Sequence, residues 1–149
     1  MRLYRISNQA NLAGDGGLRA SGRWHTKGQP IVYCAPNPAA ALLEILVHLE
    51  IDVEDFPSRY QLLTIEIPDD ISMAAVQTDV LPGDWWRDPA ATRAIGDDWL
   101  RQRTTFLLAV PSAIVPETTN YLLNPSHPDN PRIRIASIAA YRFDERLRR

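Results

Sequence analysis

The stretch that decides the fold is residues 31–50, which read Ile31-Val32-Tyr33-Cys34-Ala35-Pro36-Asn37-Pro38-Ala39-Ala40-Ala41-Leu42-Leu43-Glu44-Ile45-Leu46-Val47-His48-Leu49-Glu50. The first five residues are apolar, aromatic or β-branched, which predicts a short buried strand. Asn37 is a good helix N-cap, and Pro38 suits the first helical position. A helix is therefore predicted from Pro38 to about Glu50, with a core-facing stripe made of Leu42, Ile45, Leu46 and Leu49.

Outside this unit the sequence predicts more strands than helices. Further strands are expected at residues 3–6, 60–67, 105–110 and 133–143, and a second helix is expected from Asp88 and Pro89 to about Gln102. Residues 7–30 hold five glycines and show no helical period, and so long a connection is usually functional or disordered. The fold class expected is α+β, with mixed strands, a few helices and long loops.

The composition is that of one globular domain. The 149 residues match the usual size of a single domain, and 45% hydrophobic and 23% charged residues are close to globular averages. Residues 1–149 are therefore treated as one domain. A net charge of −2 gives no overall basic surface, which argues against direct binding of nucleic acid. The sequence contains no apolar run of about 18 residues and no secretory signal, which favours a cytoplasmic protein that does not contact a membrane.

Charge is unevenly distributed along the chain. Residues 1–43 and 132–149 each carry a net charge of +4, whereas residues 44–98 carry −10. Such asymmetry predicts either a positive cleft where the two ends meet or an ordinary solvated surface. Cys34 is the one cysteine, so no disulfide can form within the chain, and a cysteine in this apolar run is expected to be a buried packing residue.

Two segments carry residues suited to chemistry. Glu44 and His48 lie four residues apart on one face of an otherwise apolar helix, so Glu44 is expected either on a narrow solvent face or at the rim of a cleft. In the glycine-rich stretch, Arg23, His25 and Lys27 lie close together with an indole between two glycines, which predicts either an anion clasp or a flexible surface turn.

Several common types of site are not supported. The Glu-x-x-x-His spacing of Glu44 and His48 matches no metal motif, so no metal is expected. Neither the Rossmann nor the P-loop glycine pattern occurs, so arginine would have to bind a phosphate. Ser112 lacks the G-x-S-x-G setting of a hydrolase nucleophile, which favours a hydrogen-bonding role.

The ordered set of these segments resembles the RES-domain family along nearly the whole chain. The set comprises Gly22-Arg23-Trp24-His25, residues 31–35, the alanine-rich helix with Glu44 and His48, Pro111-Ser112, Asn120-Tyr121-Leu122-Leu123-Asn124-Pro125 and His127-Pro128. That family is named for an arginine, a glutamate and a serine, which correspond to Arg23, Glu44 and Ser112.

The resemblance implies a toxin of a type II toxin–antitoxin pair, with a fold similar to that of ADP-ribosyltransferases. Such a toxin consumes NAD as a substrate, not as a cofactor, by cleaving the nicotinamide–ribose bond, and thereby depletes cellular NAD. Water, phosphate or a protein remains open as the acceptor. The implied partner is an Xre-type antitoxin, through which any contact with nucleic acid would be indirect, and a homodimer within their complex is compatible with this assignment.

The residue types suit this chemistry. A carboxylate can stabilise an oxocarbenium-like ribose, which makes Glu44 the first catalytic candidate. Arg23 is expected to bind the diphosphate, with Arg5 as a second phosphate ligand. Tyr33 is expected to stack its ring on the nicotinamide. Ser112 is expected to hydrogen-bond the ribose or the amide, and His48 is expected to orient Glu44.

Two other functions remain open at this point. The same arginines and aromatic rings would serve a nucleotide-binding module without turnover. A ribonuclease toxin would instead use two of the chain's histidines, His25, His48 and His127, as general acid and base, although an acidic protein repels RNA.

Overall fold

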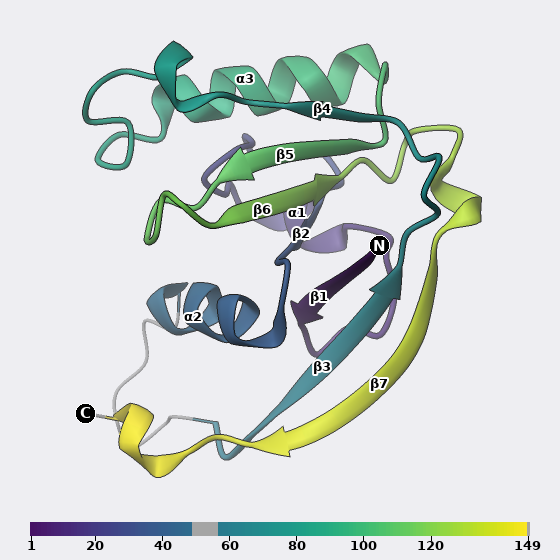
Figure 1. Ribbon diagram of the computed structural model, residues 1–149, viewed down its shortest axis with the longest axis vertical. Coiled ribbons are helices and arrows are strands. Elements are labelled where there is room, and N and C mark those ends of the chain that lie inside the picture. The colour runs from purple at the N-terminus through teal and green to yellow at the C-terminus, as the bar shows by residue number, and fades with distance from the viewer. Residues whose placement is uncertain (49–56, 149) are drawn as a thin grey trace.

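The computed structural model describes residues 1–48 and 57–148, which form two β-sheets and three α-helices (Figure 1). The first sheet is antiparallel, in the order β1-β3-β7, and consists of β1 (Arg2–Ile6), β3 (Arg59–Glu66) and β7 (Arg134–Arg142). The second sheet has the order β2-β6-β5-β4 and consists of β2 (Val32–Cys34), β6 (Thr119–Leu123), β5 (Leu107–Pro111) and β4 (Met73–Ala75). Within it, β4 and β5 are parallel and the other pairs are antiparallel.

Three α-helices accompany the two sheets. They are α1 (Asp15–Arg19), α2 (Pro38–His48) and α3 (Ala90–Gln102), accompanied by the short 3₁₀ segments η2 (Thr78–Val80), η3 (Asn130–Arg132) and η4 (Glu145–Arg148). Figure 1 shows α3 lying along the second sheet and α2 below it. A single bridge between Tyr4 and Ala35 links the two sheets next to the start of α2. The α+β class expected from the sequence is confirmed.

The apolar core has two layers because both faces of the second sheet are covered. One cluster, which includes Leu3, Leu63, Val32 and Leu107, fills the space between the two sheets. A second cluster packs the other face of the second sheet against α3, and it includes Leu108, Leu122 and Trp99. Every residue of β5 is therefore buried, which explains why this strand reads as a continuous apolar run.

The predicted helix starts are confirmed. The Asn37 side chain accepts a hydrogen bond from the amide of Ala40 at 2.8 Å, so it satisfies one of the free amides at the start of α2. Asp88 does the same for Ala90, at 2.9 Å, at the start of α3. The predicted end of the first helix at Glu50, together with Leu49, lies outside the described residues.

The stripe of α2 that is predicted to face the core is less buried than expected. Ala41 is the buried residue of this helix, whereas Leu42, Ile45 and Leu46 are only half-buried. The helix lies beside β1 and borders a pocket. This pocket is lined by Ala41, Glu44, Ile45 and the exposed residues Val47 and His48.

Three elements are absent from the sequence prediction. The helix α1 lies within the glycine-rich stretch, and the strands β4 and β6 lie in segments where short apolar runs are interrupted by turn residues. The other predicted strands correspond to β1, β2, β3, β5 and β7, with ends shifted by one or two residues.

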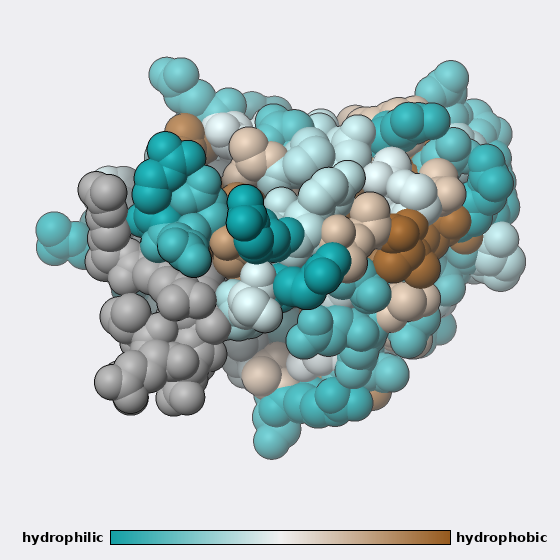
Figure 2. Space-filling view, turned by 90° about the horizontal axis from the view of Figure 1, so that it is seen from below, coloured by the Kyte–Doolittle hydropathy of each residue, from teal (hydrophilic) through white to brown (hydrophobic). Residues whose placement is uncertain are grey.

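One face of the molecule is mainly polar. Figure 2 shows this face from below the view of Figure 1, where hydrophilic residues cover most of the coloured surface and apolar residues form small groups. Within residues 1–48 and 57–148, no helix has both the length and the apolar character needed to cross a bilayer.

Candidate active site

A pocket with a cavity volume of about 360 Å³ lies where the two sheets and α2 meet. It is lined by β1, β2, α2, parts of residues 16–25 and the adjoining ends of β5 and β6. Its size falls within the usual range for small-molecule sites. Arg5, Arg23, Tyr33, Glu44 and His48 all line this pocket, so the fold brings five of the six predicted site residues together.

Glu44 is fixed on the pocket wall through one of its two oxygens. The Ser112 hydroxyl donates to Oε1 at 2.7 Å, and the Asn120 side-chain amide donates to the same oxygen at 2.8 Å. Oε2 has no hydrogen bond among the described residues, so it is the oxygen left for a bound molecule. Glu44 therefore lies in a cleft, and the alternative of a plain solvent face is wrong.

Ser112 lies behind Glu44. Its side chain is only 2% exposed, and its oxygen accepts hydrogen bonds from the amides of Ile114 and Val115 at 3.1 and 3.2 Å. The hydroxyl hydrogen is therefore directed at Glu44. This geometry favours a role in holding the carboxylate over the direct contact with ribose or amide expected from the sequence.

Tyr33 is held by a hydrogen-bond clasp at its hydroxyl. His25 Nε2 lies 2.9 Å from the carbonyl of Ala20, which can only accept, so Nε2 carries the proton and Nδ1 is free to accept. The Tyr33 hydroxyl donates to Nδ1 at 2.7 Å and accepts from the Trp24 amide at 3.1 Å. Burial lowers the pKa of His25 and raises that of Tyr33, so both stay neutral. The tyrosine ring, and not its hydroxyl, is therefore available to a ligand.

We expect Tyr33→Phe to lower the free energy of unfolding by about 1–3 kcal/mol, because the change leaves His25 Nδ1 and the Trp24 amide without their shared partner in a buried setting. Urea denaturation measures this change. The matched control is Tyr141→Phe on β7, where the side chain is 49% exposed, and there we expect a change within about 0.5 kcal/mol. Equal losses in the two variants would contradict the clasp.

The segment that carries Arg23 is bound to α3. Thr92 donates to the carbonyl of Arg23 at 2.5 Å, and Arg93 donates to the carbonyl of Gly22 at 2.8 Å. Asp97 accepts from both the amide and the hydroxyl of Thr26. Of the three residues predicted to bind an anion in this segment, Arg23 is the one placed to do so. His25 is buried and neutral, and Lys27 does not line the pocket.

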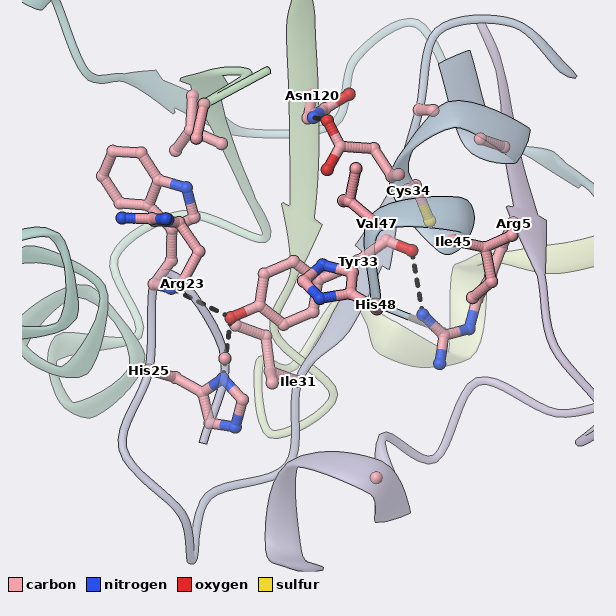
Figure 3. Close-up of a pocket in the computed structure, with 18 of the residues that line it drawn as sticks. Arg5, Arg23, His25, Ile31, Tyr33, Cys34, Ile45, Val47, His48 and Asn120 are labelled. Atoms are coloured by element: carbon pink, nitrogen blue, oxygen red, sulfur yellow. Dashed lines mark hydrogen bonds between the residues drawn. The ribbon is translucent and has the colours of Figure 1, made fainter. Parts of the chain in front are cut away.

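The two pocket arginines lie on either side of Tyr33 (Figure 3). Arg23 donates through Nη1 to the carbonyl of Trp85 at 3.4 Å, and Arg5 donates through Nη1 to the carbonyl of Tyr33 at 2.9 Å. Each guanidinium keeps further N–H groups for an anion. The sequence suggests a positive cleft formed by both ends of the chain. Among the described residues, the arginines that line the pocket come from the N-terminal part. Arg134 and Arg132 are instead paired with Glu66 and Asp70 away from the pocket.

The remaining candidates separate into different roles. Cys34 is buried, and burial raises the pKa of its thiol to about 12, so it is a packing residue as expected. His48 lines the pocket, but the described partners of Glu44 are Ser112 and Asn120, so the expectation that His48 orients Glu44 is wrong. His127 packs against Phe106 and does not line the pocket. Among the described residues, no group of three ligating side chains is placed to bind a metal.

Known proteins resemble this chain over nearly its whole length. The family model of the RES domain matches residues 2–144. The chain belongs to the RES domain family. A relative from Pseudomonas putida named Toxin Res is 50% identical over 147 residues, which covers 99% of each chain. A relative from a Sphingobium species, named Prs ADP-ribosylating toxin, is 40% identical and covers 97% of this chain and 94% of its own.

The fold of the RES domain is also found in a solved structure. The crystal structure of the Mycobacterium tuberculosis MbcT–MbcA toxin–antitoxin complex contains a chain that matches 99% of this chain and 86% of its own length, with a TM-score of 0.75. The two sequences are only 17% identical, so this likeness concerns the fold.

Sequence reasoning missed the residues that support this RES site from behind. Asn120 belongs to the family resemblance, but the sequence alone indicates no role for it. The sequence does not single out the α3 residues Thr92, Arg93 and Asp97 either. A signal was nevertheless present, because Gly96 in the middle of a 13-residue helix is unfavourable unless another segment approaches closely.

Proposed function

We propose that this RES protein is the toxin of a toxin–antitoxin pair and that it consumes NAD by breaking the bond between nicotinamide and ribose. The observation that supports this most directly is the Glu44 carboxylate, which is held by two donors on one oxygen and has its other oxygen left for a ligand. The two arginines of the pocket and the ring of Tyr33 supply the binding groups that a dinucleotide requires.

In the proposed reaction the bond between ribose C1′ and the nicotinamide nitrogen breaks, and its electron pair moves onto the ring nitrogen. The ring is cationic in NAD, so it leaves as neutral nicotinamide without a general acid. Positive charge develops on the ribose, where Glu44 Oε2 is the nearby anionic group that stabilises it. An acceptor nucleophile then bonds to C1′ and loses its proton.

The binding roles follow from the chemistry of each side chain. Arg23 and Arg5 hold the diphosphate, because planar guanidinium groups bind phosphate oxygens through two parallel hydrogen bonds. Tyr33 presents its ring to the flat nicotinamide, with its hydroxyl engaged elsewhere. His48 is exposed at the pocket and is a further contact for the ligand, while Ser112 acts through Glu44.

The test is to incubate purified protein with NAD and to quantify nicotinamide by chromatography, with and without phosphate. We expect nicotinamide to appear together with ADP-ribose or, when phosphate is the acceptor, its phosphorylated form. Binding of NAD without any product, even with a cell extract as a source of protein acceptors, would instead indicate a nucleotide-binding module.

A protein acceptor is supported by the Sphingobium relative, which is named as an ADP-ribosylating toxin. Labelled NAD distinguishes this acceptor from water and phosphate, because transfer leaves labelled ADP-ribose on a protein band. The appearance of free ADP-ribose alone would assign the reaction to hydrolysis.

We expect Arg23→Ala to weaken NAD binding by about tenfold to 100-fold, the usual effect of losing hydrogen bonds to a charged group. Arg23→Lys should restore part of the affinity, because lysine keeps the charge but lacks the planar fork. Calorimetric titration with NAD measures both changes. The matched control is Arg19→Ala, an exposed arginine that does not line the pocket, and its affinity should equal that of the wild type.

The proposed partner is an Xre-type antitoxin. This is supported by the likeness of the fold to a chain of a toxin–antitoxin complex and by relatives named as toxins. Co-expression of this chain with the product of an adjacent Xre-type gene, followed by affinity purification, tests the pairing.

The ribonuclease alternative loses its basis in the described residues. A general acid and base must lie close to one substrate bond, but His127 lies apart from the pocket, and both ring nitrogens of His25 are already engaged by the Tyr33 hydroxyl and the Ala20 carbonyl. His48 would have to act alone.

A further inference from the structure

We infer that Asn120 is a positioning residue that fixes the orientation of the Glu44 carboxylate, so that one oxygen stays directed toward bound NAD. This inference rests on the proposed function. Asn120 lies on β6, 76 positions away from Glu44 in sequence, and β6 pairs with both β2 and β5. The strand therefore places the amide from a rigid part of the sheet.

The orientation of the Asn120 amide is fixed by chemistry. A carboxylate oxygen only accepts hydrogen bonds, so the NH₂ group must face Glu44 Oε1, as the 2.8 Å contact shows. A rotated amide would bring two acceptors together. The carbonyl oxygen Oδ1 consequently points away from Glu44. Figure 3 shows the labelled Asn120 side chain at the edge of the pocket.

Asn120 Oδ1 is buried and has no hydrogen-bond partner among the described residues. Leaving a buried carbonyl unpaired is unfavourable, and an apolar side chain of similar shape would avoid that cost. The carbonyl half of the side chain therefore gives no reason for an asparagine here. Its NH₂ group, however, makes the second of two hydrogen bonds that hold Glu44 Oε1, which does explain it.

The two donors have different consequences for Glu44. Ser112 is itself held by two backbone amides, so it fixes the position of Oε1 from one side. Asn120 adds a donor from the neighbouring strand, and the two directions together restrict rotation of the carboxylate. Without Asn120 the carboxylate could turn about its last bond, and Oε2 would no longer be held toward the pocket.

The first experiment measures Asn120→Leu. We expect a folded protein with a nearly unchanged KM for NAD and a kcat lower by up to about 100-fold, which is the size of effect that misplacing a reacting group produces. A purely structural role would lower the melting temperature and leave the kcat of the folded protein unchanged. A kcat within about twofold of the wild type would overturn the inference.

The second experiment uses Asn120→Asp, with Thr119→Asp as the control. Thr119 is the exposed neighbour on the same strand, so its substitution adds a charge without touching Glu44. In Asn120→Asp a shared proton can replace the amide hydrogen at low pH, and its loss leaves two carboxylates in contact. We expect kcat of this variant alone to fall as pH rises from about 5 to about 8.

The outcomes separate this inference from the proposed function. A wild-type protein that never consumes NAD overturns both. An active wild type together with unchanged kcat in Asn120→Leu, or with identical pH profiles for Asn120→Asp, Thr119→Asp and the wild type, overturns the role of Asn120 alone. Asn120→Leu decides the matter if Asn120→Asp does not fold.

Discussion

Glu44→Gln is expected to reduce the turnover of NAD by about 100- to 1,000-fold, which corresponds to about 2.7–4 kcal/mol of lost transition-state stabilisation. Glutamine can keep both hydrogen bonds of the wild type, because its carbonyl oxygen can accept from Ser112 and Asn120 as Oε1 does. The group that replaces Oε2 is then a neutral NH₂. The shape of the site survives while the negative charge beside the ribose is lost, so affinity for NAD should change much less than turnover.

Nicotinamide release and thermal unfolding should be measured on the same Glu44→Gln sample. The matched control is Glu117→Gln, which changes an exposed glutamate outside the pocket and should leave release unchanged. A folded Glu44→Gln protein that releases nicotinamide at the wild-type rate would remove the carboxylate from the reaction.

The elements that could be predicted from the sequence are those with a strong local signal. The start of α2 follows from Asn37 and Pro38, and β5 follows from a long apolar run. The strand β6 reads Thr-Asn-Tyr-Leu-Leu between turn residues, so it has little local signal and forms because β2 and β5 flank it. Its register places Asn120 opposite Val110, a pairing between distant segments that periodicity does not reveal.

In the candidate site, too, some features follow from a local sequence signal and others depend on distant contacts. An isolated glutamate in an apolar helix predicts either a surface position or a cleft, and the family resemblance favoured the cleft. Which residues hold that glutamate depends on contacts across 68 and 76 positions of sequence. For the same reason Ser112 could be recognised as a site residue, although its place behind Glu44 could not.

The expected stripe on α2 is confirmed only in part. Leucine and isoleucine at positions 42, 45 and 46 predict a helix that packs its largest side chains inward. In the structure these three side chains are half-buried and Ala41 is the buried residue of the helix, which borders a pocket. Glu44 and Ile45 line that pocket, and counting apolar residues alone does not predict which residues of the helix border it.

Gly96→Ala is expected to destabilise the protein by about 3 kcal/mol, the upper part of the range for overpacking, although glycine to alanine within a helix ordinarily stabilises by about 1 kcal/mol. A Cβ at this position would lie 1.6 Å from the carbonyl oxygen of Trp24 and 2.7 Å from its carbonyl carbon. These are backbone atoms, so no side-chain rotation relieves the overlap. The segment that carries Arg23 would have to move away from α3.

This displacement should also weaken NAD binding, since the hydrogen bonds of Thr92 and Arg93 to the same segment would lengthen. Urea denaturation and calorimetric titration with NAD measure the two effects. The control is Gly83→Ala, where a Cβ meets no atom within 4 Å and stability should stay within about 0.5 kcal/mol of the wild type. If Gly96→Ala instead proves as stable as Gly83→Ala, the helix and the Arg23 segment do not approach each other this closely in solution, and the close contact of α3 would not explain how Arg23 is positioned.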